Sequence, residues 1–387
     1  RRPLIVAGGG TLYGLATEAL KRFAETHGVP VAETQGGKGS LAWDHPLQLG
    51  AIGVTGSPAA NALARDADCV LAIGTRLQDF TTGSHSLFPQ AKLVSLNVNG
   101  FDAIKWHGAM LRADARRGLE ALTGALPGWR ADDAWRARAG NEAARWRADL
   151  LRVTGVRDVA LPCDGEVVGA VQRSAADSAH GDVVVCAAGT LPGELHKLWR
   201  TSAPGGYHVE YGYSCMGYEI AGGIGVRMAR PDREVVVMVG DGSYLMMNSE
   251  IATSLMLGLK LVIVVLDNRG YGCINRLQQA CGGAPFNNLL ADCVQGPDGP
   301  PPIDFAAHAR SLGAQAENVK TIPELEAALG RARASKRTYV VCIETDPNRT
   351  IDAGGWWWEV AVPEVSARPE VRAARARYDD DRRKQRP

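Results

Sequence analysis

The stretch that decides the fold is Glu234-Val-Val-Val-Met-Val-Gly-Asp-Gly242, an apolar run closed by a glycine-flanked aspartate. A β-branched run of this kind is typical of a buried parallel strand. Its end would carry the Asp241 carboxylate to the carboxyl edge of the sheet. A second run, Leu261 to Asp267, is closed by Asn268 and followed by the glycine-rich turn 269–272. We therefore expect two oxygen-bearing side chains to lie together at one sheet edge.

The spacing of these two runs fits neighbouring strands. Twenty-five residues lie between Gly242 and Asn268, enough for one helix and one strand of a right-handed crossover. Hard oxygen ligands, completed by waters or phosphate oxygens, suit Mg²⁺. The pattern predicts a Mg²⁺–diphosphate clamp, with a plain structural turn as the alternative.

Composition narrows the class of protein. The chain has 387 residues, 45% hydrophobic and 22% charged, with a formal net charge of +1. That is room for two globular domains, and the balanced charge favours neither a nucleic acid nor a membrane surface as partner. No apolar run reaches membrane-spanning length and no signal-peptide pattern occurs, so we expect a cytoplasmic protein. The eight cysteines form no CxxC pair and are expected to be reduced, buried thiols.

The first part of the chain alternates strands and helices, which predicts a doubly wound α/β domain. Its expected elements are a helix over about 11–27 and strands over Pro3–Gly8, Val29–Glu33, Asp68–Gly74 and Lys92–Asn97. Gly8-Gly9-Gly10 follows the first strand but lacks the GxGxxG spacing of a dinucleotide site. We interpret it as a tight strand-to-helix turn.

The second part predicts another doubly wound parallel sheet. Its expected strands are Asp182–Ala187, Glu234–Gly240, Lys260–Asp267 and Thr338–Thr345, and 287–302 is expected as a loop near the active edge. An amphipathic helix over 129–152 would connect the two domains. The predicted boundaries are 1–128, 129–162, 163–350 and 351–387.

The last of these segments is a tail with an unusual composition. It contains Gly354-Gly355-Trp356-Trp357-Trp358 and a charged helical stretch, 371–385. We expect the tryptophans to clasp the body of the protein or another subunit rather than to contact a substrate.

The Gly-Asp-Gly and Asn pair, together with Tyr213-Ser-Cys-Met-Gly-Tyr-Glu-Ile-Ala-Gly-Gly223, resembles the thiamine diphosphate (ThDP)-dependent enzymes. Residues 36–79 are similar to the central domain of acetolactate-synthase-like members. The resemblance implies a central domain followed by a diphosphate-binding domain. It also implies Mg²⁺ ligation by Asp241, Asn268 and the Gly270 carbonyl, and an apolar prop for the bent cofactor in Met216. The implied cofactor-binding set is Gly189, Thr190, Ser214, Met216, Gly240, Asp241, Gly242, Ser243, Asn268, Gly270 and Tyr271.

Three passages resemble one branch of this family, the enzymes of inositol catabolism that open a cyclic diketone. They are 207–219, 268–275 and the tail with Val362-Pro-Glu-Val-Ser366. The resemblance implies ThDP- and Mg²⁺-dependent hydrolytic C–C cleavage of 3D-trihydroxycyclohexane-1,2-dione to 5-deoxy-glucuronate. The alternatives are an acetolactate-type carboligase, a 2-oxo-acid decarboxylase or a catalytically incomplete ThDP-binding fragment. An NAD-dependent dehydrogenase would need an acidic residue about 20 positions after the glycine-rich turn, and Glu25 there falls mid-helix.

Family members activate ThDP with a glutamate on an N-terminal domain, which a second subunit supplies. Nothing in this chain resembles that domain, so we expect a fragment that holds the metal and diphosphate half of the site. The implied assembly is a homodimer or homotetramer with the active site at the subunit interface. His208 and Glu210 are weak candidates for substrate contact or proton transfer, and structural hydrogen bonding is the alternative for both. No residue set here compels a flavin or nucleotide in the central domain.

Overall fold

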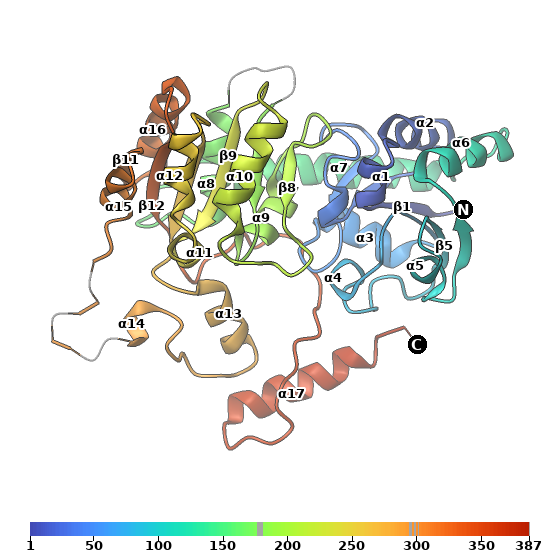
Figure 1. Cartoon of the computed structure of the whole chain (residues 1–387). Helices are drawn as coiled ribbons and strands as arrows, with labels where there is room; N and C mark the ends of the chain where they lie inside the picture. Colours follow the sequence, from blue (N-terminus) through green and yellow to red (C-terminus); the bar gives the residue numbers. More distant parts are fainter. Residues whose placement is uncertain (176–180, 294–295, 298, 301, 387) are drawn as a thin grey trace.

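The computed structural model describes residues 1–175, 181–293, 296–297, 299–300 and 302–386. Two six-stranded parallel sheets, each flanked by helices, form the body of the molecule (Figure 1). The predicted α/β class with two doubly wound sheets is therefore confirmed. Four residues of the expected loop 287–302 lie outside the described residues, and a short helix, α14 (Leu290–Cys293), lies within it.

The first sheet has the strand order β3-β2-β1-β4-β5-β6. Its strands are β1 (Pro3–Ala7), β2 (Val31–Glu33), β3 (Gln48–Ala51), β4 (Cys69–Ile73), β5 (Lys92–Asn97) and β6 (Ala109–Arg112). Strands β3 and β6 were not predicted. Both lie at the sheet edges and are short, and β6 is largely exposed, so neither carries the buried apolar run that marks the inner strands.

The helices of this domain differ from the prediction at one place. The expected helix over 11–27 is two helices, α1 (Gly9–Tyr13) and α2 (Thr17–His27), because Leu15 adopts a left-handed conformation with φ 49°. The other helices are α3 (Pro58–Asp66), α4 (Asp79–Thr82), α5 (Gly100–Ile104) and α6 (Ala115–Ala125), with the 3₁₀ turn η1 (Gln35–Gly37). A Cβ added to Gly10 would lie 2.6 Å from the Gly74 Cα. Close backbone packing therefore explains the glycine-rich turn.

The second sheet has the order β11-β12-β10-β9-β7-β8. Its strands are β7 (Val183–Cys186), β8 (Tyr207–Val209), β9 (Val235–Gly240), β10 (Val262–Asp267), β11 (Gln315–Val319) and β12 (Tyr339–Glu344). Its helices are α8 (Asp164–Arg173), α9 (Leu191–Leu198), α10 (Tyr218–Ala229), α11 (Asp241–Met246), α12 (Glu250–Met256), α13 (Gly272–Ala280), α15 (Phe305–Ser311) and α16 (Ile322–Ala334). The edge strands β8 and β11 were missed because both are only partly buried, and β8 has only three residues.

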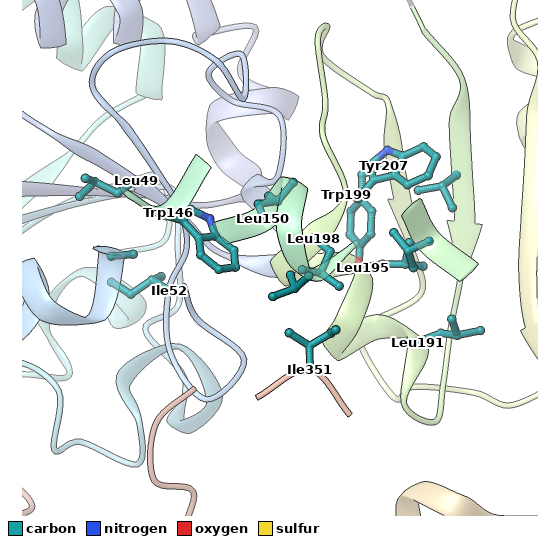
Figure 2. Packing of buried hydrophobic residues seen from close by; sticks show 14 of the residues in the cluster. Leu49, Ile52, Trp146, Leu150, Leu191, Leu195, Leu198, Trp199, Tyr207 and Ile351 are labelled. Atoms are coloured by element: carbon teal, nitrogen blue, oxygen red, sulfur yellow. The ribbon is translucent and has the colours of Figure 1, made fainter. Parts of the chain in front are cut away.

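The two domains share one buried hydrophobic cluster. Helix α7 (Asp133–Val153) lies between them, with Trp146 and Leu150 facing Leu195 and Leu198 of α9 (Figure 2). The connecting helix that the sequence predicts is therefore part of the core. Burial of this seam disfavours separation of the domains, since the apolar area would return to water.

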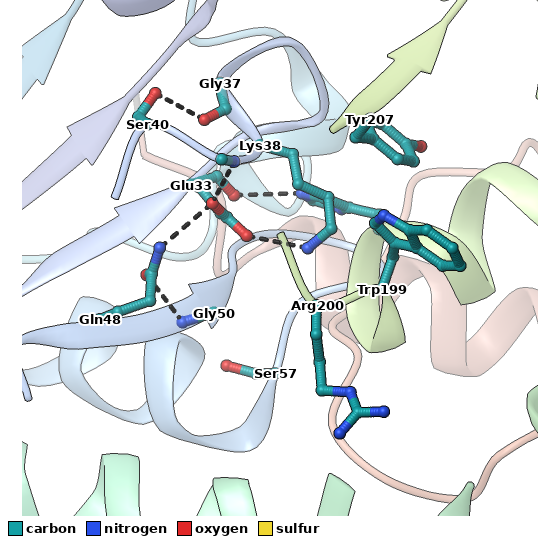
Figure 3. Close-up of polar contacts among 12 residues, drawn as sticks. Glu33, Gly37, Lys38, Ser40, Gln48, Gly50, Ser57, Trp199, Arg200 and Tyr207 are labelled. Atoms are coloured by element: carbon teal, nitrogen blue, oxygen red, sulfur yellow. Dashed lines mark hydrogen bonds and ion pairs between the residues drawn. The ribbon is translucent and has the colours of Figure 1, made fainter. Parts of the chain in front are cut away.

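A polar network crosses the same seam. Glu33 accepts hydrogen bonds from Lys38, at 2.8 Å, and from the Gln48 amide, at 3.1 Å (Figure 3). His196 of α9 bridges the Glu33 carbonyl, at 3.1 Å, and the Thr55 hydroxyl, at 3.0 Å. These contacts fix the second domain on the carboxyl end of β2.

The tail packs on the body, as predicted for its tryptophans. Trp356 donates to the Ser86 hydroxyl at 2.8 Å, and Trp358 donates to Asp79 at 3.2 Å. Helix α17 (Pro369–Arg382) follows and lies outside both sheets (Figure 1). Its end returns to the first domain, where the Arg386 N–H donates to the His85 carbonyl.

No helix among the described residues is both long and apolar enough to cross a membrane. All eight cysteines are free. The expectation that they are buried is only partly correct. Cys163, Cys186 and Cys342 are buried, whereas Cys215 and Cys293 are exposed.

Candidate functional site

The predicted acidic and amide residues meet at the carboxyl edge of the second sheet. Strands β9 and β10 pair in parallel, with Leu266 opposite Gly240. Asp241 opens α11 directly after β9 and is buried. Its Oδ2 accepts the Gly270 N–H at 2.8 Å, whereas Oδ1 is buried and has no hydrogen-bond partner among the described residues. One carboxylate oxygen is therefore held in place and the other is free to bind a ligand.

The turn after β10 carries the other proposed metal ligands. The Asn268 Oδ1 atom accepts the Gly272 N–H at 3.3 Å. Gly270 has φ +142°, and a Cβ there would collide with the Asn288 carbonyl, so only glycine fits. The Tyr271 N–H donates to that same carbonyl at 2.7 Å. The 287–289 segment thus braces the turn from outside.

Asp267 is a charged neighbour that the sequence analysis left inside its strand. Burial raises the pKa of Asp241, and the nearby Asp267 carboxylate raises it further. Burial likewise raises the pKa of Asp267, which accepts the Arg269 N–H at 2.9 Å. A buried carboxylate beside a half-buried one favours either a shared proton or a bound cation. The one feature of the sequence that could have marked Asp267 as a site residue is its position next to Asn268.

The residues present fit a metal-bound diphosphate. The Ser243 Oγ atom, like Asp241 Oδ1, is buried without a hydrogen-bond partner among the described residues. A Cβ added to Gly242 would lie 2.8 Å from a Tyr271 ring carbon and 3.4 Å from the Met216 methyl. Gly242 therefore lies against these two side chains, and its neighbours in the sequence, Asp241 and Ser243, carry the two unpartnered oxygens. In the described part of the chain, no group of three or more His, Cys, Asp or Glu side chains is arranged to hold a metal ion, so amide and carbonyl oxygens would complete a cation site.

The segment before α10, residues 210–217, is called the bend segment below and has a constrained backbone. Ser214, with φ 54°, donates its hydroxyl to the Ala187 carbonyl at 3.1 Å, and Gly217 has φ +94°. Glu210 accepts the N–H groups of Tyr213, at 3.1 Å, and Cys215, at 2.6 Å. These backbone donors lower the pKa of Glu210. Glu210 therefore acts here as a structural acceptor that shapes the turn.

His208 is also engaged within the protein. Its Nε2 atom lies 2.7 Å from the Tyr218 hydroxyl, and the two rings stack with centroids 5.9 Å apart. Burial lowers the pKa of His208, so the neutral ring is favoured near pH 7. The structure places this candidate beside the bend segment, with one ring nitrogen already occupied.

The loop after β7 holds the remaining predicted residues. Gly189 has φ +80°, and the space above its Cα is open. The Thr190 hydroxyl accepts a hydrogen bond of 2.5 Å from Arg276 of α13, which also donates to the Pro347 carbonyl. Sequence reasoning missed Arg276, although it lies one helical turn beyond Gly272. The structure thus gathers the loop, the bend segment and both strand ends at one sheet edge.

Comparison with known proteins matches both domains. The family model described as "Thiamine pyrophosphate enzyme, C-terminal TPP binding domain" matches residues 187–343, and "Thiamine pyrophosphate enzyme, central domain" matches residues 1–122. The chain is 40% identical over 407 residues to 3D-(3,5/4)-trihydroxycyclohexane-1,2-dione hydrolase of Geobacillus thermodenitrificans, covering 97% of this chain and 62% of that protein. It is 38% identical to the protein of the same name from Halalkalibacterium halodurans, with the same two coverages. For the Clostridium perfringens protein of that name the identity is 37%, over 94% of this chain and 61% of the relative. The chain thus spans about three fifths of the length of these relatives.

Proposed function

Because the chain belongs to the thiamine pyrophosphate enzyme family, we propose that it binds thiamine diphosphate with Mg²⁺ at the carboxyl edge of its second sheet. The observation that supports this most directly is the pair of buried, unpartnered oxygens on Asp241 and Ser243 on either side of Gly242. Buried polar atoms normally have partners. A cation on the first oxygen and a phosphate oxygen near the second would supply them.

Each residue of the proposed site has a separate task. Asp241, Asn268 and the Gly270 carbonyl hold the cation, and the backbone around Gly242 holds the diphosphate. Met216 would be the apolar prop for the cofactor. When bound, ThDP supplies a nucleophilic carbon and an electron sink for breaking a C–C bond. The protein contributes orientation and a dry, preorganised environment.

The proposed reaction is hydrolytic cleavage of 3D-trihydroxycyclohexane-1,2-dione to 5-deoxy-glucuronate, in the cytoplasm, as part of inositol catabolism. The names of three relatives at 37–40% identity support the substrate class. Product analysis of the assembled enzyme with the cyclic dione and with pyruvate distinguishes this activity from a carboligase or a decarboxylase. Turnover of pyruvate alone would contradict the proposal.

We further propose a homodimer or homotetramer in which a partner subunit covers this site and supplies the activating carboxylate. Large apolar side chains near the site are exposed, including Met246 at 51%, Ile274 at 53% and Tyr271 at 43%. Exposed apolar surface of this kind is typical of a protein interface. Sedimentation equilibrium measures the assembly, and a monomer at micromolar concentration would contradict it.

The experiment that tests the cofactor site is Asp241→Ala, studied by calorimetry with ThDP and Mg²⁺. We expect Mg²⁺-dependent binding to weaken by about a hundredfold or more, as expected for loss of a metal ligand. The fold should persist, because the buried Asp241 carboxylate is only half satisfied without a cation.

Asp182→Ala is the matched control. Asp182 is a buried carboxylate paired with Arg333 at 2.7 Å, far from the site. Its loss should lower stability and leave ThDP affinity unchanged. Undiminished Mg²⁺-dependent binding in Asp241→Ala would rule out the proposed ligand set.

A further inference from the structure

The buried carboxylate of Glu219 lies where two segments of the proposed site meet, the loop after β7 and the bend segment. Glu219 is on the first turn of α10 and is 1% exposed. Its Oε2 accepts the Gly217 N–H at 3.0 Å, and its Oε1 accepts the Ala188 N–H at 3.4 Å. Burial raises the pKa of Glu219. One side chain therefore accepts hydrogen bonds from both the loop after β7 and the bend segment.

We propose that Glu219 is the positioning residue that holds these two segments in register for the cofactor. The inference rests on the proposed function, because the segments it joins carry the proposed prop, Met216, and the proposed diphosphate contacts. Glu219 itself is too deeply buried to touch a substrate. Its action is through the backbone groups that it holds.

The backbone geometry explains why such a tether is needed. Ser214 and Gly217 both have positive φ angles, 54° and 94°, and a non-glycine residue in this region costs free energy that surrounding contacts must offset. A Cβ on Gly217 would lie 3.1 Å from the Met247 Cβ, so the bend is also pressed against the end of α11. The hydrogen bond to Glu219 holds Gly217 in this conformation, one residue after Met216.

The other side chains that hydrogen-bond within or to the bend segment make fewer connections between segments. Glu210 is close to the protein surface and binds only Tyr213 and Cys215, which lie in its own turn. Ser214 makes one such connection, to Ala187. Among the described residues of this edge, the Glu219 side chain alone accepts hydrogen bonds from both the loop after β7 and the bend segment. Preorganisation of loops in this way raises affinity by reducing the ordering that binding requires.

The test is Glu219→Gln, because glutamine keeps the shape but replaces one acceptor oxygen with an N–H₂ donor. One of the two N–H groups, of Gly217 or Ala188, would then face a donor. Hydrogen–deuterium exchange of the whole chain without cofactor should show exchange at Ala188 and Gly217 faster by about tenfold. Calorimetry with ThDP and Mg²⁺ should show affinity weaker by about tenfold as well.

Glu166→Gln is the control. Glu166 is also a buried glutamate near a helix N-terminus, where it accepts the Cys163 N–H at 2.9 Å, but it lies on α8 and contacts no segment of the site. This variant should lower thermal stability without changing exchange at 188 and 217 or the cofactor affinity. Glu219→Asp, which keeps both oxygens on a shorter stem, should recover part of the affinity.

The outcomes separate this inference from the function on which it rests. Unchanged exchange at both amides in Glu219→Gln overturns the positioning role, whatever the cofactor does. Wild-type affinity in Glu219→Gln, or an equal loss in Glu166→Gln, overturns it as well. If the wild-type protein does not bind ThDP with Mg²⁺, the proposed function is contradicted, and Glu219 has no cofactor site to position. The exchange rates at Ala188 and Gly217 still decide whether Glu219 holds the two segments together.

Discussion

Glu194 on α9 is a buried acid that the proposed chemistry does not use. Burial raises the pKa of Glu194 to about 7, the Lys197 ammonium lowers it and Asp164 raises it again. A raised folded-state pKa means that the folded protein binds the proton more tightly than the unfolded chain does. Stability is therefore lost as pH rises from about 4.5 to about 7. Glu194→Gln removes this loss, so we expect a variant more stable than wild type by on the order of 2 kcal/mol above pH 7.

Urea unfolding at pH 4.5 and pH 8 measures this difference, which should nearly vanish at the lower pH. Glu120→Gln, on the exposed face of α6, gives the control. A Glu194→Gln variant that is less stable than wild type at pH 8 would show that the carboxylate is ionised and paired in the folded protein.

Individual site residues were predictable where a residue with a metal-binding side chain directly follows an apolar run. Asp241 and Asn268 stand out because a polar residue directly after a buried strand must lie at the sheet edge. Glu219 and Arg276 gave no such signal. They reach the site from within helices, and their side chains contact residues distant in the sequence, Ala188 for Glu219 and Thr190 for Arg276. Such contacts depend on the tertiary packing of the helices.

At the scale of elements, the buried strands were predictable and the edges were not. β9 and β10 are apolar along their length because helices cover both faces of the sheet. β8 and β11 pair on one side only and contain polar residues such as His208 and Asn318. Their place in the sheet comes from hydrogen bonding to a neighbour, which local composition does not encode.

The tryptophan segment is an element whose loss can be measured. Trp356 packs against Gly83 and donates to Ser86, in a loop where Ser84 and His85 have positive φ angles. We expect Trp356→Ala to lower the free energy of unfolding by about 2 kcal/mol, less than for a fully buried tryptophan. Protease cleavage between 346 and 368 should become faster. Val365→Ala, at a site that is 92% exposed, should change neither quantity, and an equally protected tail in Trp356→Ala would contradict the clasp.

At the scale of the whole molecule, the two domains are joined by a seam that no local pattern predicted. The sequence indicated two separate sheets and a connecting helix. The structure merges them through α7 and α9 into one core (Figure 2). The polar contacts that join one domain to the other include pairs more than 140 positions apart, Thr55 with His196 and Gln35 with Pro192. Those pairings follow from the docking of complete domains.

His196 makes this seam sensitive to acid. Burial lowers the pKa of His196 to about 3, and the nearby Lys38 charge lowers it further. The neutral ring can donate to the Glu33 carbonyl and accept from Thr55, whereas the charged ring has no acceptor nitrogen. A lowered pKa means that the unfolded chain binds the proton more tightly, so stability falls as pH drops below about 6.5. The loss should reach about 2 kcal/mol at pH 5.

The opposite slope of Glu194, two residues earlier, acts over much of the same range, so the effect must be taken as a difference between variants. Urea unfolding of wild type and His196→Gln at pH 7.5 and pH 5 gives that difference. We expect His196→Gln to be less stable than wild type at pH 7.5, because the amide bridges the two domains less well, and the gap to narrow or reverse at pH 5. Glu194→Gln/His196→Gln should then show little dependence on pH beyond that of the remaining carboxylates. A constant gap between wild type and His196→Gln would mean that the ring stays neutral in both states and that acid weakens the seam elsewhere.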